Sequence, residues 1–244
     1  MNFSLKFPIV SNNCLGGELY RYFNKNFDNP LIWNIIPKQD FDRLIKNWKD
    51  LDLLNFDIVP IETGNGNFYF DFVLNGNINV YFVHHLFNYE LNKSSQIKRV
   101  YGSDYLGGYE TVLNLVERNW IERTKRFMNL KLPPIFLYYE RPPRDRDCWT
   151  MFNENGEPVK MYNCSTHDLK TLINIEEKSG ELNIIIHKKD CNVFEINESK
   201  RFTKLENRTN IITLSEKFEM SSQWIIDALH DLKTVPEFLK QICL

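Results

Sequence analysis

The 244-residue sequence predicts a single domain of the α/β or α+β class. Segments with strand-like and helix-like patterns alternate along the chain, which favours these classes over an all-helical or an all-β protein. Hydrophobic residues make up 43% of the chain, enough for one large core without disulfide or metal staples. An Asn-Gly pair between two alternating apolar runs adds a β-hairpin. We therefore expect residues 1–244 to form one three-layer domain with a mixed sheet, a hairpin and flanking helices.

The N-terminal part of the chain predicts a strand, a turn and two helices. Residues 5–10 form an apolar run that ends in the polar turn Ser11-Asn12-Asn13. Leucine and aromatic residues at helical spacing predict a helix over residues 15–24. Asp40 is the expected N-cap of the next helix, which carries apolar residues at helical spacing.

The hairpin is predicted over residues 67–85, with its turn at Asn75-Gly76. Both central residues of a type I′ turn need positive φ, and Asn-Gly meets this requirement best. Side chains alternate between the two faces of a strand, so His84 and His85 at the end of the second strand point to opposite faces.

The second half of the chain begins with the longest helical pattern, over residues 109–130. Its apolar stripe faces the core, and Pro133-Pro134 ends it before a buried strand. Residues 140–165 are polar, rich in alternating charges and proline, and predict a long loop or lid. The remaining predicted elements are strands at 135–139, 182–187 and 211–214, and helices at 168–175 and from about 221 to 232.

Composition excludes several classes of function. A formal net charge of -2 gives no electrostatic basis for binding nucleic acid. No apolar run approaches the roughly 20 residues needed to span a bilayer, and the N-terminal segment has no signal-peptide pattern, so we expect a cytoplasmic protein. The five cysteines are odd in number and lack CxxC spacing, which argues against a disulfide framework and against a zinc knuckle.

Cys14 is the first candidate for chemistry, because it follows a predicted strand and turn and begins a predicted helix. A helix start offers backbone N–H groups and the positive end of the helix dipole, which lower the pKa of a thiol and can hold an oxyanion. Asn12, Asn13 and Gly16 are the expected substrate contacts, and Gly16 and Gly17 would allow close approach. The competing interpretation is a buried structural cysteine.

His84 and His85 are the candidates for a general base. One of them could meet Cys14 while the other packs or is solvated. Adjacent histidines on one strand cannot both bind the same metal ion without distortion, so no metal is expected. The competing interpretation is that both are structural or surface residues.

Arg123 and Arg126 on the long predicted helix are candidates for binding a phosphate or carboxylate, because arginine binds such groups bidentately. They lie with Asn119 on a face next to the apolar stripe. Aromatic neighbours would suit a phosphorylated donor such as coenzyme A. The competing interpretation is that both arginines pair with carboxylates such as Glu117 or Glu122 at the edge of the core.

A series of short motifs, taken in chain order, is more specific to one family than any motif alone. The motifs, in order, are Ser11-Asn12-Asn13-Cys14, Leu31-Ile32-Trp33-Asn34, Asp40-Phe41, a strand ending in His, Arg118 to Phe127, and Ile135-Phe136-Leu137. The series resembles a bacterial and viral family of unknown-function domains described as papain-like cysteine peptidases. Related proteins occur in exopolysaccharide and capsule loci, including capsule acetyltransferases with a Cys/His site. The resemblance covers roughly residues 5–140, with a looser match to the C-terminal strands and final helix.

The resemblance implies a papain-like fold in which Cys14 matches the family's cysteine. His84 or His85 matches its histidine, although the family usually has His followed by Asp, so which one aligns is open. Arg123 and Arg126 match an arginine-rich helix in which one of a usual arginine pair is here Ile or Glu.

The implied function is acyl transfer to a polysaccharide or glycan precursor in surface polysaccharide biosynthesis. Acetyl-CoA would be the acyl donor, and no tightly bound cofactor is implied. The alternatives are a papain-like cysteine hydrolase or peptidase, and a catalytically inactive domain that binds a glycan or a protein.

Overall fold

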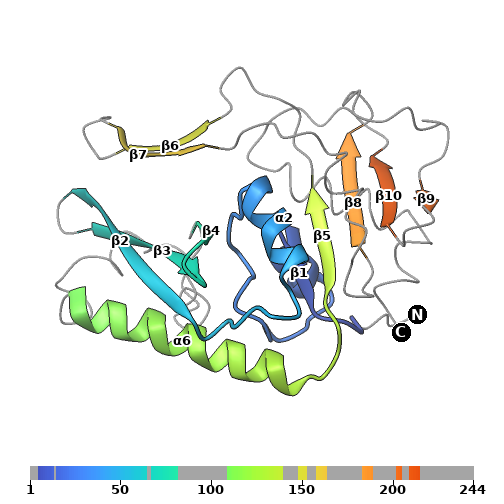
Figure 1. The fold of residues 1–244 in the computed structure, drawn as a ribbon, viewed down its shortest axis with the longest axis horizontal. Helices are drawn as coiled ribbons and strands as arrows, with labels where there is room; N and C mark the ends of the chain where they lie inside the picture. The colour runs from blue at the N-terminus through green and yellow to red at the C-terminus, as the bar shows by residue number, and fades with distance from the viewer. Residues whose placement is uncertain are drawn as a thin grey trace.

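Helices and mixed sheets build the protein, so the broader fold prediction is confirmed in its α+β form (Figure 1). The structure is a computed structural model. It describes residues 5–13, 15–64, 67–81, 109–139, 148–152, 158–163, 183–188, 202–204 and 209–214.

The largest sheet has four parallel strands and one antiparallel strand, in the order β1-β5-β8-β10-β9. Parallel neighbours need long crossover connections, and the chain between β1 and β5 contains three described helices and a second sheet. The apolar runs predicted as strands in the second half correspond to β5, β8 and β10. The bounds are β1 (Ile9–Ser11), β5 (Ile135–Tyr139), β8 (Asn183–Lys188), β9 (Phe202–Lys204) and β10 (Thr209–Leu214).

The predicted hairpin is confirmed as far as the structure describes it. β3 (Asn67–Leu74) pairs antiparallel with β4 (Ile78–Val80), and the turn residues Asn75 and Gly76 have φ of 48° and 71°. A further strand, β2 (Phe56–Gly64), pairs with β3 and makes this a three-stranded sheet. The sequence pattern did not indicate β2, because Pro60 lies inside it, and proline in a sheet is tolerated at an edge strand such as this one.

Three helices are described: α1 (Leu15–Tyr22), α2 (Lys38–Lys46) and α6 (Tyr109–Asn129). α1 is shorter than predicted because Asn24, with φ of 49°, ends it in the left-handed conformation. The predicted N-cap at Asp40 is wrong. The N-cap is Pro37, three residues earlier; its ring fixes φ, and it makes no side-chain cap hydrogen bond.

One hydrophobic core joins the five-stranded and the three-stranded sheets through α2 and α6. Figure 1 shows α6 as a long green helix running past β2, β3 and β4. Trp120 of α6 is fully buried and stacks on Phe72 of β3, with 4.2 Å between ring centroids. Trp48, which follows α2, packs edge-on against Phe136 of β5 in the five-stranded sheet, with 5.1 Å between ring centroids.

The prediction of a long loop over residues 140–165 is wrong in part. β6 (Cys148–Phe152) and β7 (Pro158–Asn163) pair antiparallel within it. Trp149, Thr150 and Tyr162 are among the aromatic and β-branched residues that favour these strands. The predicted helices at 168–175 and 221–232 lie outside the described residues. Within the described part of the chain, no helix is both long enough and apolar enough to cross a bilayer.

Candidate functional site

The candidate site is the carboxyl end of β1, where the chain leaves the parallel sheet. Ser11 is the last residue of β1 and lies level with Leu137 of β5. The Asn12 backbone N–H extends this pairing by donating to the Leu137 carbonyl at 3.3 Å. Ligands of open α/β sheets bind at the carboxyl ends of parallel strands, so this edge is the expected place for chemistry. Cys14 lies outside the described residues, between the described Asn13 and Leu15.

Asn13 caps the start of α1. Its side-chain oxygen Oδ1 accepts a hydrogen bond from the Leu15 backbone N–H at 3.0 Å. The Asn13 backbone N–H in turn donates to Ser11 Oγ at 3.4 Å, and both side chains are buried. An Asn in this position satisfies a helix N–H group that would otherwise lack an acceptor. The Leu15 N–H is therefore already engaged, and a substrate oxyanion would need other donors.

Gly16 and Gly17 have packing roles in the structure. A Cβ added to Gly16 would lie 2.8 Å from Ser11 Cβ, so the glycine lets α1 press directly on β1. A Cβ added to Gly17 would lie 2.3 Å from Cε2 of the Trp33 indole. Trp33 itself has φ of 67°, a conformation that bulky residues rarely adopt. Both glycines are thus explained by neighbouring protein atoms rather than by space left for a substrate.

The loop before α2 connects the end of β1 to the end of β4. The Ile36 backbone N–H donates to the Asn12 carbonyl at 3.0 Å. The preceding residue, Ile35, exchanges two backbone hydrogen bonds with Tyr81, at 2.8 and 2.7 Å. Tyr81 follows β4 directly, so the hairpin ends beside the segment that carries Asn12. His84 and His85, which come next along the chain, lie outside the described residues.

Arg123 and Arg126 occupy different environments. Arg123 is 3% exposed, and its guanidinium carbon lies 5.7 Å from the centroid of the Phe27 ring. Arg126 is exposed on the outer side of α6. Phe27 also meets Trp33 edge-on, with 6.1 Å between centroids. The Phe27 and Trp33 rings therefore form an aromatic layer that contacts Arg123 through Phe27. Because Arg126 is exposed, the two arginines do not share one surface.

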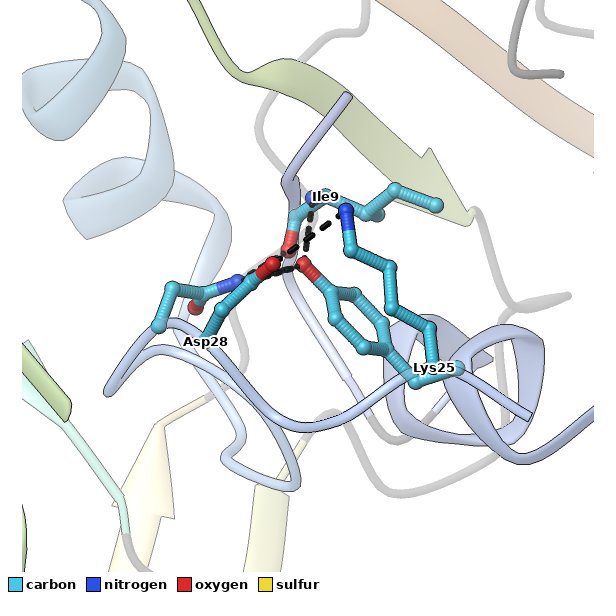
Figure 2. Close-up of polar contacts among 5 residues, drawn as sticks. Ile9, Lys25 and Asp28 are labelled. Carbon is cyan, nitrogen blue, oxygen red and sulfur yellow. Dashed lines mark hydrogen bonds and ion pairs between the residues drawn. The ribbon is translucent and has the colours of Figure 1, made fainter. Parts of the chain in front are cut away.

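A buried polar network around the Tyr20 hydroxyl joins α1 to the amino end of β1 (Figure 2). The hydroxyl donates to Asp28 Oδ1 at 2.5 Å and accepts from the Ile9 N–H at 3.2 Å and from Asn29 Nδ2 at 3.3 Å. Lys25 Nζ lies 3.2 Å from Asp28 Oδ2. Burial, and then the neighbouring Asp28 carboxylate, raise the pKa of the Tyr20 phenol, so it stays protonated and remains a donor.

Sequence analysis did not find the Tyr20 network, because its members have no periodic spacing. The signal available was Asp28-Asn29-Pro30, a cluster of turn residues, which indicates a turn but no partner. His187 is on β8, opposite Thr213 of β10 and near the carboxyl end of β8. Within the described ranges, no group of three or more His, Cys, Asp or Glu residues could hold a metal ion.

Comparison with known families gives one match. Residues 3–100 match a family described as a domain of unknown function, DUF1919. The matched segment contains Cys14, His84 and His85 and ends before α6. No curated protein matches the chain.

Proposed function

We propose that this protein is a cysteine-dependent acyltransferase in which Cys14 is the nucleophile and His84 or His85 is the general base. The observation that carries the proposal is the backbone path from Asn12 through Ile36 and Ile35 to Tyr81. Two residues of chain span at most about 7 Å, and three span at most about 11 Å. Cys14 and His84 are therefore each tethered within a short reach of this path. The segment that matches DUF1919 includes Cys14, His84 and His85.

The proposed reaction has two steps. The Cys14 thiolate attacks the acyl carbon of a thioester, and the coenzyme A sulfur leaves with the proton carried by the histidine. The acceptor hydroxyl then attacks the Cys14 thioester, gives its proton to the histidine, and releases the Cys14 thiolate. Backbone N–H groups of the first turn of α1 other than that of Leu15 would hold the oxyanion of each step.

A polysaccharide or glycan precursor is the proposed acceptor, and acetyl-CoA is the proposed donor. The resemblance to capsule-locus acetyltransferases supports this substrate class. Because Arg123 is buried beside Phe27 and Arg126 is exposed, the phosphates of a donor would contact Arg126 and not both arginines. The same resemblance supports a papain-like hydrolase or peptidase as the second candidate, with water as the acceptor.

The first test is the pH dependence of thiol alkylation. Iodoacetamide labelling, resolved for each cysteine by mass spectrometry, should modify Cys14 at about pH 6, where an ordinary thiol with a pKa of about 8.5 is almost inert. Cys148→Ser serves as the control, because it removes another cysteine and should leave the profile of Cys14 unchanged. Labelling of Cys14 with an ordinary profile would contradict the proposal and favour an inactive binding domain.

The second test distinguishes transfer from hydrolysis. The protein is incubated with radiolabelled acetyl-CoA, with and without a pool of glycan acceptors, and both acetylated glycan and free acetate are measured. Transfer predicts label in the glycan, and hydrolysis predicts acetate alone. Loss of either activity in His84→Asn or His85→Asn identifies the base. His187→Asn is the matched control. A loss of activity in this variant would assign the general base to His187 on β8 instead.

A further inference from the structure

The buried network around Tyr20 fixes α1 against β1 at a point away from the start of the helix. We propose that Tyr20 and Asp28 are positioning residues that set where the first turn of α1 lies over the carboxyl end of β1, and through it the reactivity of Cys14. The part of this proposal that concerns Cys14 rests on the proposed function above. The part that concerns α1 stands on the described residues alone.

Two contacts one helical turn apart fix α1 on the strand. Gly16 presses on Ser11, the last residue of β1, while the Tyr20 hydroxyl binds the backbone N–H of Ile9, its first residue. The helix therefore runs back along the strand it follows. One turn of helix rises about 5.4 Å, and the two contacts together determine both how far α1 slides and how it rotates.

The hydrogen bonds that hold α1 at Tyr20 are directional. The Tyr20 hydroxyl uses one donor and two acceptor positions, on Asp28, Ile9 and Asn29. Asn29 Nδ2 also donates to the Ile9 carbonyl at 2.9 Å, so both backbone groups of Ile9 are held from the same side. Tyr20 is fully buried. A fully satisfied buried network accepts one arrangement, whereas an apolar contact of the same area tolerates small displacements.

Lys25 completes the network from the segment that follows α1. Its ammonium group contacts the second carboxylate oxygen of Asp28 and lies 5.5 Å from the centroid of the Tyr20 ring. The charge of Asp28 is thus shared between the phenol and the ammonium group. A carboxylate is a strong acceptor, so one Asp28 oxygen holds the phenol while the other holds the ammonium group.

A displacement of α1 would change the chemistry at its start. The field of a helix dipole and the reach of its N–H groups fall off within the first turn. Cys14 directly precedes Leu15, the first residue of α1. Under the proposed function, the pKa of the Cys14 thiol therefore depends on how firmly the first turn of α1 is held. Because α1 has only eight residues, loosening its Tyr20 end also loosens that first turn.

The experiment compares Tyr20→Phe with the unmodified protein by two readouts. Hydrogen exchange of peptides covering Leu15 to Leu19 should be at least about tenfold faster in Tyr20→Phe, because the hydroxyl that anchors the helix is gone. The midpoint of the Cys14 alkylation profile should rise, so that labelling at about pH 6 slows at least about threefold. Asp28→Asn keeps an acceptor oxygen for Tyr20 but removes the charge, and should change both readouts in the same direction by less.

Trp120→Phe is the control for a purely structural effect. It removes the buried hydrogen bond from Trp120 Nε1 to the Leu53 carbonyl, 2.8 Å long, in the other part of the core. This variant should exchange faster in β3 and α6 while leaving the Cys14 profile unchanged. If Tyr20→Phe only melts earlier, with neither readout changed, the positioning role is overturned. An ordinary Cys14 profile in the unmodified protein would overturn the proposed function alone, since exchange of α1 still decides whether Tyr20 positions it.

Discussion

The β1–α1 unit and the α6–three-stranded sheet unit both bury side chains in the core, but different interactions hold them. Hydrogen bonds to the Tyr20 hydroxyl and close contacts at two glycines hold α1. Large rings hold α6, where Trp120 stacks on Phe72 and meets Phe56 at 5.6 Å. Ring packing supplies free energy in proportion to the buried area, whereas a buried polar network yields less net free energy and fixes a geometry. The candidate site, at the carboxyl end of β1, therefore lies on the β1–α1 unit, whose geometry the polar network fixes.

The largest expected effect is on the ring-packed unit. Trp120→Ala removes a fully buried indole and its hydrogen bond to Leu53, and should lower the free energy of unfolding by about 3–5 kcal/mol. Urea denaturation followed by circular dichroism measures this loss. Met128→Ala, on the same helix but 59% exposed, is the control and should change stability by less than about 0.5 kcal/mol. Equal effects of the two substitutions would mean that α6 does not anchor the core.

The second prediction concerns the close contact of α1 with Trp33. Alanine is the better helix former, so by propensity Gly17→Ala should stabilise by up to about 1 kcal/mol. The added Cβ would lie 2.3 Å from the indole, and overpacking should reverse the sign, to a net loss of about 1–3 kcal/mol. The double variant Gly17→Ala/Trp33→Leu should recover part of the loss, because the smaller side chain yields the space. A stabilised Gly17→Ala would show that α1 and Trp33 are not in this contact.

The third prediction concerns the cap at the start of α1. Asn13→Ala removes the acceptor for the Leu15 N–H and should lower the free energy of unfolding by about 1 kcal/mol. Asn13→Asp keeps an acceptor oxygen and should retain most of the stability. Thermal melts of the two variants, run side by side, measure the difference. Identical melting temperatures would indicate that the Asn13 side chain contributes nothing to the helix start.

Elements with strong local patterns were predictable from the sequence, and elements that depend on a distant partner were not. α6 has an apolar stripe over many turns, and the Asn75-Gly76 turn needs two positive φ angles that few other pairs adopt. β2 contains Pro60 and becomes a strand only because β3 is beside it.

The candidate site shows the same division. The strand, turn and helix around Asn13 were predicted, but whether protein or ligand fills the space at Gly17 depends on Trp33, which is 16 residues away. Arg126 comes three positions after Arg123 on α6, so the two side chains point about 60° apart around the helix axis. That offset is enough to bury one at the core and leave the other in solvent.

The smallest expected effect comes from the polar contact between α2 and β4, and its sign depends on pH. Asp40 accepts hydrogen bonds from Arg43 Nη1 and from Asn79 Nδ2, both at 3.1 Å. Burial raises the pKa of the Asp40 carboxyl above its ordinary value, against the opposing effect of these two partners. The folded protein therefore binds the Asp40 proton more tightly than the unfolded chain does. This proton stabilises the fold at low pH, and its contribution is lost as the pH rises through the raised folded-state pKa.

Asp40→Asn removes that titration. On acidification from neutral pH to below about pH 4, the free energy of unfolding of the unmodified protein should therefore rise relative to that of the variant. Urea denaturation of both proteins at the two pH values measures the shift. Asp42→Asn removes a carboxylate from the same helix, where it pairs with Lys46, and is the matched control. A shift in the opposite direction for Asp40→Asn would mean that Arg43 and Asn79 outweigh burial. The α2–β4 contact would then differ from the Tyr20 network, in which burial is the largest cause of the raised pKa of the phenol.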